Sequence, residues 1–270
     1  TIVAMGTSLP ECSVSINASI AGSNGLAISN AVGSNIFNLM MVCGFCALFS
    51  PLAVDSGTLK KEFPFSMAVS VIMLVLGLAG MALGHMDGII LLIIFIAFLY
   101  WMVSSAKKAR TSGQQEEDGY EIIPVWKCIF YIAGGAAAII VGGDVVVDSA
   151  TKIAHMFKLS DNLIGLTIVA MGTSLPELVT SVVAAKKNEA DLAFGNVIGS
   201  NIFNVLFVLG IASAISPIGF SMENFIDAVI LVAMSIAVWI FSWSKHKIER
   251  GEGIVMLLMY AAYMVYICKR

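Results

Sequence analysis

Charged residues are scarce in this chain of 270 residues: Lys, Arg, Asp and Glu together make up 12% of it, about half of the share that is usual in soluble domains. Hydrophobic residues account for 59%, and the mean hydropathy is +0.92. The formal net charge is only −3. This composition excludes an ordinary soluble domain and indicates a membrane protein, whose surroundings are a lipid bilayer.

Histidine and cysteine are also few. The three histidines fall at the ends of predicted helices, and the five cysteines lie in or at the edge of apolar segments, where a thiol packs like a small hydrophobic group. Cys43 and Cys46 have C-x-x-C spacing, but no second pair completes a metal site. No zinc-protease histidine motif and no nucleophile beside a base is evident. We therefore expect neither an enzyme nor a cofactor.

Long hydrophobic runs are abundant. Nine segments are apolar over roughly 20 residues, which is enough to cross about 30 Å of hydrocarbon. Lipid cannot satisfy exposed backbone groups, and the runs lack the alternation of barrel strands, so they are expected to be helices. The predicted fold class is therefore all-α, in a polytopic membrane protein. The predicted spans are 1–22, 26–49, 63–84, 87–106, 128–156, 161–185, 191–215, 222–243 and 250–268.

The basic residues are divided unequally between the two sides that nine alternating spans create. Of 15 Lys and Arg residues, 11 fall on one side of the membrane. Because Lys and Arg accumulate in cytoplasmic loops, this side is predicted to be cytoplasmic and the C-terminus to lie outside, in the plasma (inner) membrane. The 11 are Lys60, Lys61, Lys107, Lys108, Arg110, Lys127, Lys186, Lys187, Lys245, Lys247 and Arg250.

The chain contains an internal repeat. When it is shifted by 166 positions, 26 of the 51 residues at 1–51 match those at 167–217. Two blocks are shared. TIVAMGTSLPE occurs at 1–11 and 167–177, and GSNIFN begins at Gly33 and Gly199. Four predicted spans lie between the span at 1–22 and the matching span at 161–185, so the copies cross the membrane in opposite directions. Inverted repeats of this kind are a recurrent construction of secondary transporters.

This symmetry divides the chain into a first inverted repeat over 1–106, a cytoplasmic linker over 107–124 and a second inverted repeat over 125–270. The helix predicted at 128–156 has no counterpart ahead of Thr1. We therefore expect nine helices here and ten in the full chain, with about 30 to 40 further N-terminal residues.

Each copy carries a glutamate in the middle of a predicted span, at Glu11 and Glu177. A carboxylate there costs about 2.5 to 3.5 kcal/mol, which a bound cation would offset. Pro10 and Pro176 remove a backbone N–H and are expected to free carbonyls in the preceding turn, near 4–6 and 170–172. Side chains four residues apart share one face of a helix. The resulting polar stripes are Thr7, Glu11 and Ser15; Thr173, Glu177 and Ser181; Asn30, Ser34 and Asn38; and Asn196, Ser200 and Asn204.

These stripes offer carboxylate, hydroxyl, amide and carbonyl oxygens but no imidazole or thiolate. Hard cations such as Ca²⁺ and Na⁺ accept that set, whereas zinc or copper would be expected to recruit His or Cys. The two glutamates carry a formal charge of −2, which balances one Ca²⁺ or two Na⁺. Competition between the two ions for one site would couple their gradients.

The doubled GTSLPE and GSNIFN motifs resemble the alpha repeats of the cation/calcium antiporter superfamily, specifically its prokaryotic sodium/calcium exchangers. The resemblance implies the inverted-repeat exchanger fold and alternating-access exchange of Ca²⁺ for Na⁺. Some members of that family have Asp at one of the positions of Asn38 and Asn204, where this chain has Asn at both. The implied metal ligands are Thr7, Ser8, Glu11, Ser34 and Asn38, their partners Thr173, Ser174, Glu177, Ser200 and Asn204, and the carbonyls of Ala4 and Ala170.

The residues alone are also compatible with other functions and other roles for single side chains. A buried glutamate exchanges a proton as readily as a metal, so a proton-coupled calcium antiporter is the main alternative. A cation channel would use similar ligands but needs a continuous pore. Gly33, Ser34, Gly199 and Ser200 could serve helix packing only. Asp144 and Asp148 could line the outer ion entrance or lie at a helix end that water reaches. Beyond the ions and the bilayer, we expect no nucleic acid and no obligatory protein partner.

Overall fold

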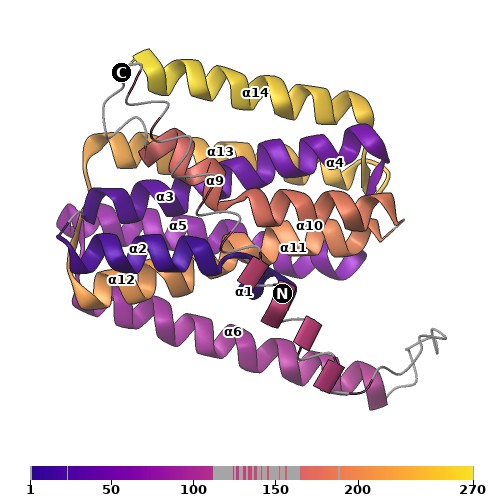
Figure 1. Ribbon diagram of the computed structural model, residues 1–270, viewed down its shortest axis with the longest axis horizontal. Helices are drawn as coiled ribbons and strands as arrows, with labels where there is room; N and C mark the ends of the chain where they lie inside the picture. The colour runs from indigo at the N-terminus through magenta and orange to yellow at the C-terminus, as the bar shows by residue number, and fades with distance from the viewer. Residues whose placement is uncertain are drawn as a thin grey trace.

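The computed structural model describes residues 2–22, 24–111, 165–187 and 189–269, together with isolated positions between 124 and 156 (Figure 1). Most of the helix predicted at 128–156 and of the linker predicted at 107–124 lies outside these residues. Within the described part of the chain, six helices are long and apolar enough to cross a membrane, or seven if one bent pair counts as a span.

The first half begins with two short helices and continues with three longer helical segments, over 24–49, 58–80 and 85–111. The helix pair α3 and α4 is continuous through a π-helical turn at Asn38–Val42, and α5 extends a π-helical turn at Thr58–Glu62. These match the spans predicted at 26–49 and 63–84 to within a few residues. The helices are α1 (Ile2–Thr7), α2 (Leu9–Ile20), α3 (Asn24–Phe37), α4 (Cys43–Phe49), α5 (Phe63–Gly80) and α6 (His85–Thr111).

The second half repeats this order. A shift of 166 positions carries α2, α3, the following π-helical turn and α4 onto elements with the same bounds in the second half. The π-helical turns there are Gly165–Val169 and Asn204–Val208. The helices are α9 (Ala170–Thr173), α10 (Leu175–Lys186), α11 (Ala190–Phe203), α12 (Leu209–Ile215), α13 (Met222–Trp243) and α14 (Arg250–Lys269).

The predicted all-α fold holds, with the addition of four two-residue strands that the hydrophobic pattern did not predict. β1 (Leu52–Ala53) pairs antiparallel with β4 (Lys247–Ile248), and β2 (Ala82–Leu83) pairs antiparallel with β3 (Ile218–Gly219). Each ladder joins a loop of the first half to a loop of the second. The strands form because loop backbone between helices still needs hydrogen-bond partners.

The structure differs from the predicted spans at one helix end and at two interruptions. α6 continues to Thr111, five residues past the predicted end at 106, because Ala, Lys and Arg favour helix even where hydropathy falls. The spans predicted at 1–22 and 161–185 are each interrupted, at Ser8 and Ser174.

The central helices and the outer helices differ in burial. The segments Gly25–Phe49 and Ala190–Ile215 are mostly buried, whereas few residues of His85–Lys108 and Arg250–Lys269 are buried. In Figure 1, α6 and α14 accordingly lie at opposite edges of the molecule, with the repeated helices between them. The outer helices approach the core closely at glycines. Gly88 of α6 packs against Gly210 of α12, and Gly253 of α14 packs against Gly44 of α4.

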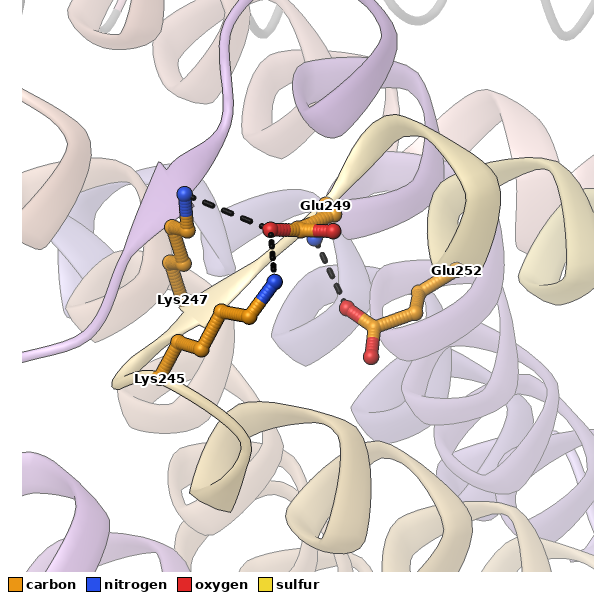
Figure 2. A network of polar contacts seen from close by, with 4 residues as sticks. All are labelled: Lys245, Lys247, Glu249 and Glu252. Carbon is orange, nitrogen blue, oxygen red and sulfur yellow. Dashed lines mark hydrogen bonds and ion pairs between the residues drawn. The ribbon is translucent and has the colours of Figure 1, made fainter.

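Basic side chains gather at the end of the molecule that carries the β1–β4 ladder. Lys186 lies 5.0 Å from the centre of the Phe49 ring. Lys247 of β4 and Lys245, two residues before it, both contact Glu249 Oε1, at 3.3 and 3.0 Å (Figure 2). Hydrogen bonds from these two lysines lower the pKa of Glu249, and Glu252 accepts the Glu249 backbone N–H at 2.7 Å. This end corresponds to the side predicted to be cytoplasmic.

Candidate functional site

Two helix breaks define the candidate site. α1 and α2 meet at Ser8, and α9 and α10 meet at Ser174. In the second half, the helix axes before and after the break differ by 45°. Pro10 and Pro176 occupy the first turns of α2 and α10, where a proline fits a starting helix but removes the donor that a continuing helix would need. The duplicated Ser-Leu-Pro-Glu sequence therefore encodes the break.

The carbonyls of Ala4 and Ala170, at the start of the two stretches in which free carbonyls are predicted, both accept hydrogen bonds. The Ala4 carbonyl accepts from the Ser8 backbone N–H at 3.0 Å and from the Thr7 hydroxyl at 3.2 Å. The Ala170 carbonyl is bonded by the corresponding residues of the second half. The carbonyl that loses its donor is the one four residues before each proline, which is Gly6 in the first half and lies within the predicted stretch 4–6.

The two glutamates reach across to the opposite half. Ser8 Oγ donates to Glu177 Oε1 at 2.7 Å, and Ser174 Oγ donates to Glu11 Oε1 at 2.8 Å. All four side chains have zero exposed surface. The two breaks therefore face each other, and each carboxylate is hydrogen-bonded by the serine that precedes the other half's glutamate helix.

The serines of α3 and α11 also point to the breaks. Ser34 Oγ donates to the Ala170 carbonyl at 3.4 Å and lies 3.5 Å from Thr173 Oγ1. Ser200 Oγ donates to Glu177 Oε1 at 3.4 Å. The structure thus brings threonine, serine and glutamate oxygens of the predicted set into one buried network.

A second part of each stripe joins neighbouring helices. Asn30 Nδ2 donates to Ser15 Oγ at 3.1 Å, and Asn196 Nδ2 donates to Ser181 Oγ at 3.2 Å. Asn30 Oδ1 also accepts from Thr173 Oγ1 at 3.3 Å. These residues hold α3 against α2 and α11 against α10, at the margin of the glutamate network.

Several buried oxygens have no hydrogen-bond partner. Glu11 and Glu177 each use one carboxylate oxygen and leave the other unpartnered, and Asn38 and Asn204 each leave the amide oxygen unpartnered. Asn196 Oδ1 is the fifth such atom. A buried polar atom without a partner costs about 1 to 3 kcal/mol, and more if it is charged. Four unpartnered oxygens on four predicted ligands are an arrangement that a hard cation would satisfy.

Asn35 and Asn201 are hydrogen-bonded to two predicted ligands but were not predicted as site residues from the sequence. Asn35 Nδ2 donates to the Asn201 carbonyl, and Asn201 Nδ2 donates to the Asn35 carbonyl, both at 3.2 Å. Their side-chain oxygens accept from Asn204 and Asn38, at 3.1 and 3.3 Å. The available signal was their place in the duplicated GSNIFN block, three residues before each predicted ligand.

Other candidates from the sequence remain apart from this network or lie outside the described residues. Cys43 and Cys46 are buried free thiols. Among the residues that the structure describes, no three His, Cys, Asp or Glu side chains cluster as a metal site, which leaves hydroxyls and amides to supplement the two glutamates. Asp144, Asp148 and His155 lie outside the described part of the chain.

Comparison with known proteins gives a consistent match. A family model described as "Sodium/calcium exchanger protein" matches residues 1–104 and 127–269. The putative antiporter CaxA of Alkalimonas amylolytica is 39% identical over 271 residues, covering 97% of this chain and 85% of its own length. The sodium/calcium exchanger MaX1 of Methanosarcina acetivorans is 30% identical, covering 98% of this chain and 86% of its own length.

The fold is also similar to a solved exchanger. The sodium-calcium exchanger NCX_Mj, soaked with 10 mM Na⁺ and zero Ca²⁺, superposes with a TM-score of 0.82 at 35% identity, covering 98% of this chain and 85% of that chain. The form soaked with 2.5 mM Na⁺ and 10 mM Sr²⁺ gives a TM-score of 0.81. These similarities confirm the predicted exchanger fold.

Proposed function

Because the chain belongs to the sodium/calcium exchanger protein family, we propose that this multi-pass membrane antiporter exchanges Ca²⁺ specifically for Na⁺, at a site centred on Glu11 and Glu177. Cation/calcium antiport is the activity of the family, and its members are transporters and not enzymes. The choice of Na⁺ as the coupling ion, the ligands and the cellular membrane are our proposals.

The observation that carries the proposal is the pair of buried glutamates, each with one oxygen bonded by a serine of the other half and one oxygen unpartnered. The bonded oxygen is held in place, and the free oxygen is available to a cation. The geometry supports a site whose other ligands are Thr7, Ser8, Ser34, Asn38, Thr173, Ser174, Ser200 and Asn204, with the carbonyls of Ala4 and Ala170 shared with their hydroxyl donors.

The charge of this site favours exchange between Ca²⁺ and Na⁺. Two carboxylates balance one Ca²⁺ or two Na⁺, and the supplementary ligands are neutral hydroxyl and amide oxygens, which both ions accept. Since the two ions would use the same carboxylates, occupancy by one excludes the other. Mutually exclusive binding makes the downhill flow of Na⁺ drive the uphill flow of Ca²⁺.

The repeat organisation supplies a means of alternating access. We propose that residues 1–106 and 125–270 act as the two inverted repeats, connected by a linker over 107–124. Their elements follow the same order, and reciprocal hydrogen bonds join them at the glutamates. A site shared between two similar halves can open to either side through small, opposite movements of those halves. We further propose that the protein lies in the plasma (inner) membrane, with the basic β1–β4 end in the cytoplasm.

Proton coupling is the alternative for the same site, because a carboxylate binds H⁺ as well as a metal. Calcium binding to the purified protein in detergent distinguishes the two. Titration calorimetry at constant pH, with NaCl or choline chloride at equal ionic strength, should show Ca²⁺ binding that Na⁺ weakens and choline does not. Ca²⁺ binding that is indifferent to Na⁺ but weakened at lower pH would favour proton coupling.

A further inference from the structure

Asn35 and Asn201 form a reciprocal bridge at the centre of the molecule. The side-chain amide of each donates to the backbone carbonyl of the other, at 3.2 Å in both directions. Each is almost completely buried: Asn35 has no exposed surface and Asn201 has 3%. Their positions, 166 residues apart, make the bridge a contact between α3 and α11 that the two halves contribute equally.

This bridge determines which way each amide points. A backbone carbonyl only accepts hydrogen bonds, so the atom of Asn201 that faces the Asn35 carbonyl must be its NH₂ group, and the other must be its oxygen. That oxygen in turn accepts only, so the atom of Asn38 that lies 3.3 Å from it must be the NH₂ group of Asn38. The remaining atom of Asn38 is its amide oxygen, which is buried and unpartnered.

The same reasoning applies to the other half. Asn35 donates to the Asn201 carbonyl, so its oxygen faces Asn204, and Asn204 Nδ2 donates to that oxygen at 3.1 Å. The amide oxygen of Asn204 is then left buried and unpartnered. Thus the backbone carbonyls fix the orientation of Asn35 and Asn201, and these two fix the orientation of Asn204 and Asn38. In both halves the amide oxygen of the last residue is left free to bind a cation.

We propose that Asn35 and Asn201 are positioning residues for the cation site: they hold Asn204 and Asn38 with their amide oxygens presented to the ion. The assignment is crossed, because Asn201 of the second half orients Asn38 of the first, and Asn35 orients Asn204. It rests on the proposed function, since Asn38 and Asn204 are ligands only if the site binds Ca²⁺ and Na⁺. Neither positioning residue touches the ion.

The physical consequence is preorganisation. An unrestrained asparagine amide rotates and presents its NH₂ group, which repels a cation, as readily as its oxygen. Ca²⁺ binding would then have to supply the free energy of turning and fixing that group. The bridge also requires a donor at positions 38 and 204, which an amide provides and an ionised carboxylate does not. If Asn35 and Asn201 served only interhelical packing, the effect of replacing them would not depend on whether Asn38 or Asn204 is present. This difference distinguishes a packing role from a positioning role.

A crossed double-mutant cycle tests this assignment. Asn201→Leu keeps a similar volume, removes the acceptor for Asn38, and leaves the Asn201 carbonyl that holds Asn35. The Ca²⁺ dissociation constant of the purified full chain would be measured by calorimetry for the wild type, Asn38→Ala and Asn204→Ala, each with and without Asn201→Leu. Size-exclusion chromatography and thermal unfolding would establish that each protein is folded.

Asn201→Leu should weaken Ca²⁺ binding about tenfold in the wild type and in Asn204→Ala, the loss expected for one buried hydrogen bond. In the Asn38→Ala background, Asn201→Leu should cause no further loss of Ca²⁺ affinity, because Asn201 acts on the ion only through Asn38. Asn35→Leu should show the reverse dependence, with its effect absent from Asn204→Ala. This mirror variant also provides the test if Asn201→Leu does not fold.

Equal losses in the Asn38→Ala and Asn204→Ala backgrounds would overturn the positioning role and indicate a general structural one, while leaving the exchanger proposal intact. Unchanged Ca²⁺ affinity in folded Asn201→Leu and Asn35→Leu would overturn it as well. Failure of the wild type to bind Ca²⁺ would instead reject the proposed function, and with it this inference.

Discussion

Ser8 donates a 2.7 Å hydrogen bond to Glu177, a residue 169 positions later in the chain. Ser174 does the same to Glu11 at 2.8 Å. These two bonds exchange partners between the repeats, so neither half contains a complete environment for its own glutamate. The site therefore exists only where the halves meet.

Replacing Glu177 by Gln should abolish Ca²⁺ transport and weaken Ca²⁺ binding by at least about 100-fold. The substitution removes one of two charges that balance the ion, a loss on the order of 3 kcal/mol for a buried charged partner. Calorimetry and flux into vesicles would measure it. Glu223→Gln makes the same chemical change at an exposed position of α13 and should transport normally. Normal transport by folded Glu177→Gln would refute the site assignment.

Ser8→Ala should weaken Ca²⁺ binding about tenfold, because Glu177 Oε1 loses a charge-assisted hydrogen bond worth about 1.5 to 3 kcal/mol. Ser174→Ala should have a similar effect through Glu11. Ser13→Ala, on the exposed face of α2, the helix that begins directly after Ser8, is the matched control. If Ser8→Ala and Ser13→Ala bound Ca²⁺ equally well, the Ser8–Glu177 bond would have no role in binding.

Acid should inhibit transport between about pH 8 and pH 5, because protons compete with Ca²⁺ for the same two carboxylates. The exposed cluster at the β1–β4 end should not contribute. The lysines lower the pKa of Glu249, so its stabilising contacts are lost only below the ordinary range for glutamate, outside this interval. The pH profile of Glu249→Gln should therefore match the wild type. A flat profile in the wild type would argue against titrating carboxylates at the site.

Gly88→Ala should destabilise the protein by about 1 to 3 kcal/mol, as overpacking does. An added methyl group would lie 2.5 Å from the backbone nitrogen of Ala214 and 2.6 Å from the Gly210 carbonyl oxygen, and backbone atoms cannot move aside cheaply. Gly80→Ala meets no atom within 4 Å and serves as the control. Thermal unfolding in detergent measures both. Equal melting temperatures for the two variants would contradict the close approach of α6 and α12.

Much of this fold could be predicted from the sequence because hydrophobic length and an internal repeat are strong local signals. The spans at 191–215, 222–243 and 250–268 agree with the structure to within one residue at each end. The helix breaks at Ser8 and Ser174 were harder to predict from the sequence, because the hydrophobic run continues across them while the helix direction changes. The two-residue strands depend on contacts between loops of different halves, which periodicity does not encode.

The sequence indicated which residues would make up the candidate site, but not which of them would be hydrogen-bonded to one another. Spacing by four placed Thr7 and Glu11 on one face, and the structure joins that face to the second half. It could not predict that Ser8 bonds Glu177, because side chains far apart in sequence meet only after the helices pack. Asn35 was missed for a similar reason: it lies outside the stripe that contains Asn38, and its role depends on the backbone of Asn201.

The most direct test of sodium-coupled exchange is uptake of radioactive Ca²⁺ into proteoliposomes containing the purified protein, loaded with NaCl or with choline chloride and diluted into sodium-free medium. Our account predicts rapid uptake from sodium-loaded vesicles only, and none in Glu177→Gln. Uptake that is equal from choline-loaded vesicles, or that requires an imposed proton gradient, would contradict it.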